Sequence, residues 1–272
     1  MLQKPETPPN RVGLFREQLM GLQVKDRARI RRLFAEISPR YDLLNHLLSA
    51  NRDRSWRRRV VAELSLPPGG RVLDICTGTG DLALEIAARV QGRVIGTDFT
   101  PEMVRRGEEK RRRRRTRNLT FLIADSLRLP FPDATFDVVT VAFGIRNVCD
   151  LAAGLNEMLR VLRPGGEAAI LEFSSPRDGW FGRVFRLYFR HVLPRLGGWI
   201  SGVAAGGEAY SYLPASVGEW PSPAEFSRQL ELSGFTGVRF VPLTLGVSVL
   251  HLAARPRIEA ASVAGVHHEP AL

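Results

Sequence analysis

The sequence predicts an α/β fold in which a mostly parallel, seven-stranded sheet is closed by an antiparallel hairpin near the C-terminus. From about residue 70 onward, short apolar runs alternate with helical patterns. Right-handed crossovers place strands that alternate with helices in one parallel sheet. The last two apolar runs, 238–241 and 247–252, lie too close together for a crossover, so they are expected to form a hairpin.

The expected core elements follow one another in a regular order. A strand near 70–75 leads into a helix that ends near residue 90, and Pro101 suits the first turn of the second helix. A third helix is expected from about Leu151 to Leu162, before the turn Pro164-Gly165-Gly166. The remaining expected strands are 93–98, 119–124, 136–142 and 168–173.

Further segments surround this core. Residues 70–173 form the expected Rossmann-like, ligand-binding core, and residues 24–69 form a helical cap that precedes it. Residues 174–221 interrupt the sheet with an aromatic, Arg-rich insertion, which we expect to form a helical lid over the substrate. Residues 222–256 hold the last helix and the hairpin. The two ends are expected to be largely disordered, the first with weak helical character: 1–23 and 257–272.

A Gly-rich turn after the first strand predicts a nucleotide site. The apolar run Val72–Ile75 contains Asp74 and is followed by Gly78 and Gly80, and a helical pattern starts directly after them. Glycine has no Cβ, so the backbone can turn sharply and a ligand can approach it closely. Asp98 ends the next strand, where a carboxylate can accept hydrogen bonds from both ribose hydroxyls. The ligand is therefore expected to be an adenosine compound.

The charges around this turn favour S-adenosylmethionine over a dinucleotide. The segment Gly78–Ala83 also fits the dinucleotide pattern G-x-G-x-x-A. Asp74 and Asp81 would, however, place negative charge where a pyrophosphate needs bare N–H groups and the positive end of a helix dipole. S-adenosylmethionine carries a sulfonium and an ammonium instead, and nearby carboxylates favour both. Together with the terminal hairpin, this predicts the class I S-adenosylmethionine-dependent methyltransferase fold rather than a dehydrogenase.

Composition limits the class of protein. Hydrophobic residues make up 44% of the 272 residues, which is ordinary for a globular protein. There is no run of about 18 apolar residues that would span a membrane, and the first residues lack the apolar region of a signal peptide. Cys76 and Cys149 form neither a disulfide framework nor a usual zinc site, so we expect a cytoplasmic protein without a metal.

The net charge of +11 predicts attraction to a polyanion. The insertion 174–221 interleaves Arg with Trp, Tyr and Phe, as amphipathic helices in a lipid headgroup layer do. We therefore expect a peripheral association with anionic membranes; a surface helix pair packed on the core is the alternative. The run Arg111–Arg115 lacks aromatic residues for base stacking, which favours a solvated helix face. No nucleic-acid partner is expected, because no base-flipping motif follows the fourth strand.

Five short motifs carry a family resemblance. The most particular are Tyr41–Ser49 (YDLLNHLLS) with Trp56-Arg57, and Phe143–Val148 (FGIRNV). The others are Leu162–Gly166, Leu171–Ser174 and Tyr210–Ser216. In this order and spacing they resemble the ubiquinone/menaquinone biosynthesis C-methyltransferase family, from about residue 28 to residue 256.

The resemblance implies an enzyme that moves a methyl group from S-adenosylmethionine to a ring carbon of a polyprenyl hydroquinone. The implied reaction converts demethylmenaquinol to menaquinol, in menaquinone biosynthesis. The ubiquinone precursor 2-methoxy-6-polyprenyl-1,4-benzoquinol stays open as a second acceptor, and a homo-oligomer stays open as the assembly. The sequence is also compatible with a nucleic-acid methyltransferase, a methyltransferase for another small molecule, or a non-enzymatic adenosine-binding protein.

The resemblance also completes the expected cofactor site. Thr79, Asp98, Asp125 and Ser126 match the family's cofactor contacts, whereas Ala142 stands where the family often has Ser. With the acid and the glycines of the turn, the expected cofactor-binding residues are Asp74, Gly78, Thr79, Gly80, Asp98, Asp125 and Ser126.

The chemistry of carbon methylation indicates which residues would assist it. Ionising one hydroquinone hydroxyl enriches the ring in electrons, but the pKa of a phenol is about 10. A cation and hydrogen-bond donors beside that oxygen would lower this pKa. Arg146 and Asn147 follow the carboxyl end of the fourth strand, where α/β sheets present ligands, and Tyr41 is expected to close over the same place. These three are the expected catalytic residues; a structural ion pair of Arg146, with Asp150 as partner, is the alternative.

Overall fold

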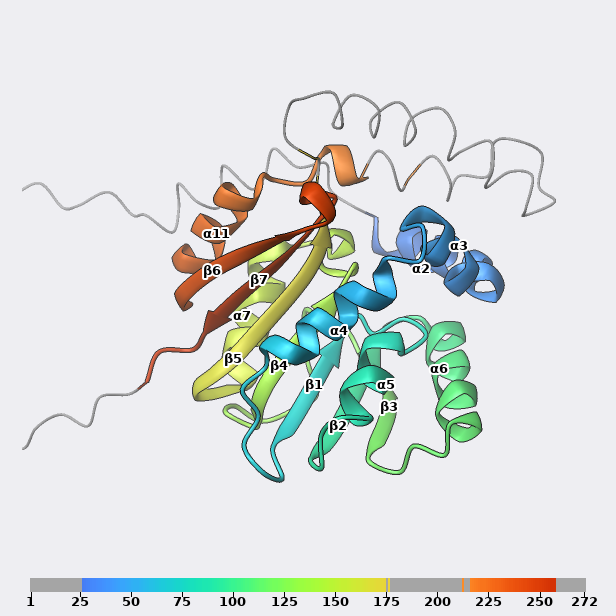
Figure 1. Cartoon of the computed structure of the whole chain (residues 1–272), viewed down its shortest axis with the longest axis horizontal. Helices are drawn as coiled ribbons and strands as arrows, with labels where there is room; N and C mark the ends of the chain where they lie inside the picture. The colour runs from blue at the N-terminus through green and yellow to red at the C-terminus, as the bar shows by residue number, and fades with distance from the viewer. Residues whose placement is uncertain (1–25, 175, 177–211, 213–215, 258–272) are drawn as a thin grey trace, which may run out of the picture.

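The computed structural model describes residues 26–174, 176, 212 and 216–257 (Figure 1). One sheet of seven strands contains β1 (Arg71–Ile75), β2 (Arg93–Asp98), β3 (Leu119–Ile123), β4 (Phe136–Ala142), β5 (Leu162–Phe173), β6 (Thr236–Leu243) and β7 (Ser248–Ala254). Their spatial order is β3-β2-β1-β4-β5-β7-β6. Strands β1 to β5 pair in parallel, whereas β7 runs antiparallel to both β5 and β6. This confirms the predicted parallel sheet with an antiparallel hairpin.

The fifth strand begins earlier than its predicted start at residue 168. Leu162 already pairs with Phe136, and the next pair in register joins Val138 to Glu167. The residues between them form an irregularity inside the strand, in which Gly165 has a positive φ of 77° and donates to the Arg255 carbonyl. The Pro-Gly-Gly segment therefore interrupts β5 instead of preceding it.

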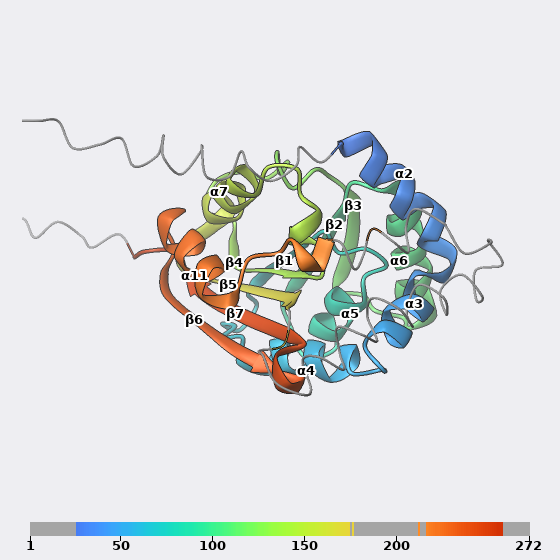
Figure 2. The same cartoon turned by 90° about the horizontal axis from the view of Figure 1, so that it is seen from above.

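Helices cover both faces of the sheet. The described helices are α2 (Arg27–Ile37), α3 (Tyr41–Leu48), α4 (Asp53–Glu63), α5 (Asp81–Ala87), α6 (Pro101–Arg113), α7 (Leu151–Val161) and α11 (Pro223–Leu232), with the 3-10 turns η1 (Ser38–Arg40), η2 (Ile145–Asn147) and η4 (Thr244–Gly246). In Figure 2, α4, α5 and α6 lie on one side of the sheet, and α7 and α11 lie on the other. Each side has its own apolar core: α4 and α5 contribute to one, α7 and α11 to the other.

Trp56 fixes α4 to the C-terminal part of the sheet. Its side chain is almost completely buried and lies 6.0 Å, between ring centroids, from both Phe143 and Phe173. Its indole Nε1–H donates to Thr244 Oγ1 at 2.8 Å, so its polar atom is satisfied as well. An aromatic ring buried with its N–H paired contributes both apolar burial and orientation. Helix α4 is therefore held in one position over the sheet.

The carboxyl ends of β1 to β4 point to one edge of the sheet, because these strands are parallel. Figure 1 shows α2 and α3 at this edge, beside α6. In the described part of the chain, no helix has the length and apolar character needed to cross a bilayer. The expectations for 1–23, for most of the insertion 174–221 and for nearly all of the tail 257–272 fall outside the described residues.

Candidate active site

A cavity of about 590 Å³ opens at the carboxyl edge of the sheet. Loops after β1, β2, β3 and β4 supply one wall, and α2 and α3 supply residues from the N-terminal side. Its lining includes Arg27, Phe34, Tyr41, Cys76, Gly78, Asp98, Phe99, Met103, Asp125, Ser126, Leu127, Phe143, Gly144, Asn147, Val148 and Cys149.

The glycines of the turn have the conformations that the sequence predicts. Gly78 and Gly80 have positive φ values of 56° and 82°, where a side chain would be strained. Gly80 also lies against Phe121: a Cβ on Gly80 would come within 2.3 Å of the Phe121 ring. Gly78 lines the cavity itself, so its backbone is open to a ligand. The turn thus brings backbone, without side chains, to the edge of the site.

Asp98 lies beside this turn and lines the cavity. The Gly78 N–H donates to Oδ2 and the Thr100 N–H donates to Oδ1, both at 2.9 Å. The side chain is only 7% exposed, and burial raises the pKa of Asp98 against the effect of these two hydrogen bonds. Each carboxylate oxygen has two lone pairs, so both can accept a further hydrogen bond from a ligand. This is the arrangement expected for a ribose-binding acid.

Asp125 and Ser126 line the same cavity after β3. The Asp125 carboxylate accepts from the Leu127 N–H at 3.1 Å and lies 2.7 Å from the guanidinium of Arg27. Arg27 comes from α2, so the N-terminal helices contact this part of the site directly. The pairing leaves Asp125 fixed at the cavity wall.

A second cavity of about 300 Å³ adjoins the first, and Tyr41 and Phe143 line both. Asp74 and Thr79 line this smaller cavity and not the larger one. Two hydroxyls, from Thr77 at 2.5 Å and from Thr140 at 2.7 Å, donate to the Asp74 carboxylate. Burial nevertheless raises the pKa of Asp74 to about 6. Six of the seven expected cofactor residues are therefore divided between two adjoining cavities, and Gly80 lines neither of them.

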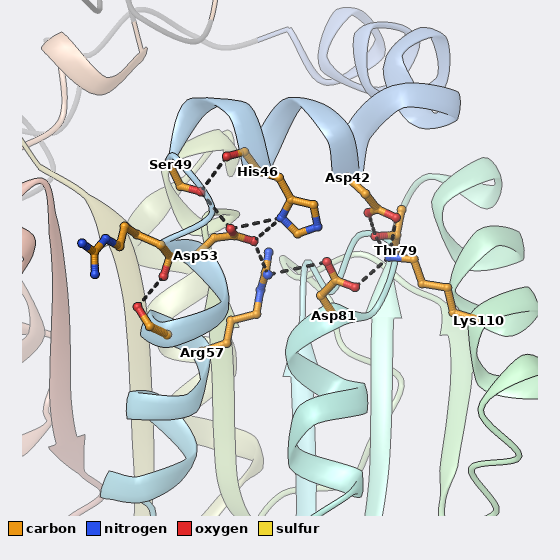
Figure 3. A network of polar contacts seen from close by, with 10 residues as sticks. Asp42, His46, Ser49, Asp53, Arg57, Thr79, Asp81 and Lys110 are labelled. Carbon is orange, nitrogen blue, oxygen red and sulfur yellow. Dashed lines mark hydrogen bonds and ion pairs between the residues drawn. The ribbon is translucent and has the colours of Figure 1, made fainter.

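Helices α3 and α4 contact the turn through a polar network (Figure 3). Lys110 of α6 donates to Asp81 at 2.7 Å and to the Thr79 hydroxyl at 2.8 Å. The Thr79 hydroxyl in turn donates to Asp42 of α3 at 2.5 Å, and Asp42 lies 2.6 Å from Lys110. Arg57 of α4 enters the same network from the other side. The hydroxyl expected to contact the cofactor is thus already held by α3 and α6.

Tyr41 and Asn147, but not Arg146, line the large cavity. Tyr41 comes from the start of α3, and burial raises the pKa of its hydroxyl. The Asn147 amide oxygen accepts from the Tyr212 hydroxyl at 3.0 Å, and burial raises the pKa of Tyr212 to about 12. Both phenols therefore stay protonated near neutral pH and are able to donate hydrogen bonds.

Arg146 is buried behind this wall. It forms an ion pair with Glu172 of β5 in which both side chains are at most 3% exposed, and it donates to the Phe143 carbonyl at 2.8 Å. The alternative prediction, an ion pair of Arg146 with Asp150, is wrong about the partner. The Asp150 carboxylate instead caps α7 by accepting from the Ala153 N–H at 2.9 Å. A helix cap uses the acid locally, which leaves Glu172 on the neighbouring strand as the counter-ion. The charge of Arg146 still lowers the pKa of Tyr41 and of Tyr212, although burial is the larger effect on both.

The two cavities fit the expected methyl donor. A buried carboxylate without a paired cation among the described residues, Asp98, suits ribose hydroxyls, and side-chain-free backbone at Gly78 suits close approach. Sequence reasoning missed several lining residues that reach the site only through packing: Arg27, Phe34, Phe99, Met103 and Leu127. It also gave no role to Arg57, although this residue belongs to the motif Trp56-Arg57. In the described residues, no group of three or more His, Cys, Asp or Glu side chains is placed to hold a metal ion, and the expectation of no metal stays a prediction.

Comparisons of the sequence identify its relatives. The profile of the ubiE/COQ5 methyltransferase family matches residues 22–255. A demethylmenaquinone methyltransferase of Thermus thermophilus is 49% identical over 226 residues, which cover 82% of this chain and 100% of that protein. One of Deinococcus radiodurans is 47% identical over 220 residues, covering 80% and 89%. The ubiquinone/menaquinone biosynthesis C-methyltransferase UbiE of Geobacter sulfurreducens is 48% identical and covers 82% and 87%.

Solved structures agree at the level of the fold. An S-adenosylmethionine-dependent methyltransferase of Aquifex aeolicus superposes with a TM-score of 0.57 at 22% identity, over 78% of this chain and 97% of that one. A phosphoethanolamine N-methyltransferase of Haemonchus contortus, in complex with S-adenosylhomocysteine, gives 0.56 at 14% identity, over 75% and 53%. The chain therefore belongs to the ubiE/COQ5 methyltransferase family and has the fold of the S-adenosylmethionine-dependent class I methyltransferases.

Proposed function

We propose that this chain transfers a methyl group from S-adenosylmethionine to a ring carbon of a polyprenyl hydroquinone, with demethylmenaquinol as the acceptor. One observation carries this proposal: a single cavity is lined both by Asp98, the acid expected to bind the methyl donor, and by Tyr41 and Asn147, the residues expected to contact the acceptor. The names of the relatives from Thermus thermophilus and Deinococcus radiodurans support the acceptor. The ubiquinone precursor 2-methoxy-6-polyprenyl-1,4-benzoquinol is the second candidate, because the relative from Geobacter sulfurreducens is named for both quinones.

The proposed mechanism depends on orientation and on the acidity of the acceptor. When bound, S-adenosylmethionine would supply a methyl group activated by a positive sulfur: the bond to sulfur breaks as the bond to the ring carbon forms, S-adenosylhomocysteine is the leaving group, and the proton of that ring carbon is released to solvent. Asp98 and the turn fix the donor, so that alignment with the ring carbon lowers the barrier. Tyr41 and Asn147 face the space for the ring, where hydrogen bonds to the ionising hydroxyl would stabilise its charge. Tyr41 acts as a donor and not as a base, because burial keeps its phenol protonated.

For Arg146 we propose a positioning role. It does not line the cavity, and it holds the Phe143 carbonyl directly beside Asn147. Its positive charge lies behind the two phenols and favours negative charge on the acceptor. The sequence predicts that Arg146 is catalytic; we now propose that it acts indirectly, through the neighbouring groups of the cavity wall.

Substituting Arg146 tests this role. Arg146→Gln would leave Glu172 charged and buried, so the matched variant is the double substitution Arg146→Gln with Glu172→Gln, which keeps a hydrogen-bonded pair. We expect this double variant to fold and bind the donor, with kcat lower by about 10- to 100-fold and with partial recovery at high pH, because the acceptor then ionises unaided. A folded double variant with the wild-type kcat and pH profile would contradict the positioning role.

A product assay tests the function itself. The purified chain is incubated with methyl-labelled S-adenosylmethionine and, separately, with the reduced form of each candidate acceptor in vesicles. We expect label on the ring carbon of menaquinol, identified by mass spectrometry, and none with the oxidised quinone, whose ring is electron-poor. Transfer to neither hydroquinone would refute the proposal. Transfer only to the ubiquinone precursor would select the second candidate.

We also propose a cytoplasmic enzyme that associates peripherally with an anionic membrane and takes no nucleic-acid partner. The proposed substrate supports the membrane association, because a polyprenyl quinone stays in the bilayer and the enzyme must reach it there. The positive net charge supports attraction to anionic lipids.

A further inference from the structure

The motif Tyr41–Ser49 with Trp56-Arg57 contains polar residues to which the proposed function assigns no role. Figure 3 shows that the side chains of His46 and Ser49 converge on Asp53, which in turn contacts Arg57. Arg57 lines the smaller cavity together with Asn45, and its side chain is only 8% exposed. A buried cation at a cavity wall needs a reason, because removing a charge from water is costly.

One edge of the Arg57 guanidinium is held in place by acids. Its Nη1 donates to Asp53 Oδ2 at 2.5 Å and lies 3.5 Å from Asp81 Oδ2. Asp53 also accepts from Ser49 Oγ at 2.8 Å and pairs with His46 Nδ1 at 2.9 Å. Burial opposes the charge of Asp53, but Arg57 and these two hydrogen bonds lower its pKa overall. The acid is thus a fixed, charged support for the guanidinium.

The N–H donors on the other edge of the guanidinium make no hydrogen bond within the described residues. Within the described residues, all contacts found for Arg57 use Nη1, whereas Nε and Nη2 make none. A guanidinium carries five N–H donors in a fork that matches a carboxylate. The arrangement holds one side of the fork and leaves the other for a ligand in the smaller cavity.

The charges of this cavity match an α-amino acid. Asp74 and Asp81 line it as acids, Arg57 lines it as a cation, and Asn45 adds an amide. A free amino acid group carries an ammonium and a carboxylate on one carbon, so it needs groups of both signs close together. The acid assigned to the ribose, Asp98, lines the adjoining cavity.

We infer that Arg57 binds the α-carboxylate of the methionyl group of the methyl donor, with Asp74 and Asp81 on the side of its ammonium. This rests on the proposed use of S-adenosylmethionine. Asp53, supported by His46 and Ser49, positions the guanidinium for this contact. On this inference, the polar residues of the motif in α3 and α4 position the Arg57 guanidinium at the methionyl end of the donor site.

Calorimetry with S-adenosylmethionine and three related ligands tests the contact. S-adenosylhomocysteine has the carboxylate, 5′-methylthioadenosine lacks the whole amino acid group, and decarboxylated S-adenosylmethionine lacks only the carboxylate. We expect Arg57→Met to weaken S-adenosylhomocysteine about 10- to 100-fold, as for a hydrogen-bonded charge pair. Its affinity for 5′-methylthioadenosine should change by no more than about twofold. Wild-type preference for S-adenosylmethionine over its decarboxylated form should disappear in the variant.

Matched variants separate this contact from effects on folding. Arg58→Met removes a charge from the same helix at an exposed position and should change none of the affinities. If Arg57→Met fails to fold because Asp53 is left unpaired, the double substitution Asp53→Asn with Arg57→Met removes both charges and takes its place. An equal loss of affinity for all three ligands, or no loss for S-adenosylhomocysteine, would overturn the inference. Wild-type protein that binds none of the three would instead refute the proposed donor.

Discussion

Asp98 shows how a single residue combines burial and charge at this site. Its carboxylate is nearly inaccessible, accepts two backbone N–H groups and has no paired cation in the described residues. Burial raises its pKa, so the ionised form depends on the hydrogen bonds that it receives. Ribose hydroxyls would add donors to the same oxygens and stabilise the charge further.

Asp98→Ala should weaken binding of S-adenosylmethionine by a few kcal/mol, because each hydrogen bond to a charged acceptor is worth about 1.5–3 kcal/mol. Isothermal calorimetry measures this, with Asp133→Ala, at an exposed position, as the matched control. Nicotinamide dinucleotides should not bind. Unchanged donor affinity in Asp98→Ala, or tight dinucleotide binding to the wild type, would contradict the assignment.

Asp74 is expected to make donor binding depend on pH. Its pKa of about 6 lies above the ordinary value, so near that pH the free enzyme is partly protonated there. A cationic donor favours the ionised form and lowers this pKa, so binding should release protons at about pH 6, and affinity should rise between about pH 5 and pH 7. Calorimetry in buffers of different ionisation enthalpy counts the protons.

The control for this pH dependence is Asp74→Asn, which keeps the size and can still hydrogen-bond to both Thr hydroxyls. It should release no proton and show a flatter affinity profile. The wild type itself should lose stability, relative to Asp74→Asn, as pH rises from about 4, near the unfolded pKa, to about 6, the folded pKa. The folded acid binds a proton there that the unfolded acid, with its lower pKa, does not hold. Equal proton release by both proteins would place the titrating group elsewhere.

Among the elements, α3 depends on partners from distant parts of the chain. Its Asp42 meets Lys110 of α6 and the Thr79 hydroxyl of the turn. These contacts are partly buried, so solvent screens them less than exposed pairs. They fix the helix that carries Tyr41 into both cavities.

Lys110→Met should loosen this attachment and lower the free energy of unfolding by about 1 kcal/mol, at the upper end for pairs that are not fully buried. Denaturant unfolding measures the loss, and limited proteolysis should cut residues 26–63 faster. Arg113→Met removes an equal charge from an exposed site on the same helix and is the control. Equal behaviour of the two variants would show that the contacts of Lys110 contribute no stability.

The sequence predicts the elements better than it predicts their contacts. Strand positions, the two glycines and Asp98 depend on local patterns and agree with the structure. The ion pairs Arg27–Asp125 and Arg146–Glu172 join separate elements, and no local pattern contains them. In the sequence Lys110 is part of a basic run, yet in the structure its ammonium pairs with Asp81, directly after the Gly-rich turn. The predicted start of β5 is wrong because Pro-Gly-Gly usually marks a turn rather than a bulge.

At the scale of the whole molecule, Lys and Arg outnumber Asp and Glu by 39 to 28. Many of the arginines are paired within the described part of the chain, such as Arg160 with Glu157 and Asp133. The insertion 174–221 adds arginines between Trp, Tyr and Phe residues, among them Arg183, Arg186, Arg190 and Arg195. A segment of this composition suits an anionic bilayer.

Vesicle flotation tests this association. The wild type should float with anionic vesicles at low salt and be released as the ionic strength approaches about 0.1 M or more, where the Debye length is about 10 Å. Replacing these four insertion arginines with Gln should abolish flotation. Replacing Arg112, Arg113, Arg114 and Arg115, at and just after the end of α6, removes the same charge and should preserve it. Flotation that is insensitive to salt, or lost equally in both variants, would contradict the proposal.

The hydrogen bond between Trp56 and Thr244 has a consequence for how the protein is made. The two residues are 188 positions apart, so α4 leaves the ribosome long before the partner that fixes it. Contacts of such long sequence separation form late, because the chain between them must first be ordered. During translation, the N-terminal helices that carry Tyr41 and Arg57 therefore lack this contact until the C-terminal hairpin has been synthesised. The proposed methyl-donor site thus begins with residues synthesised early and is closed only after the hairpin has emerged.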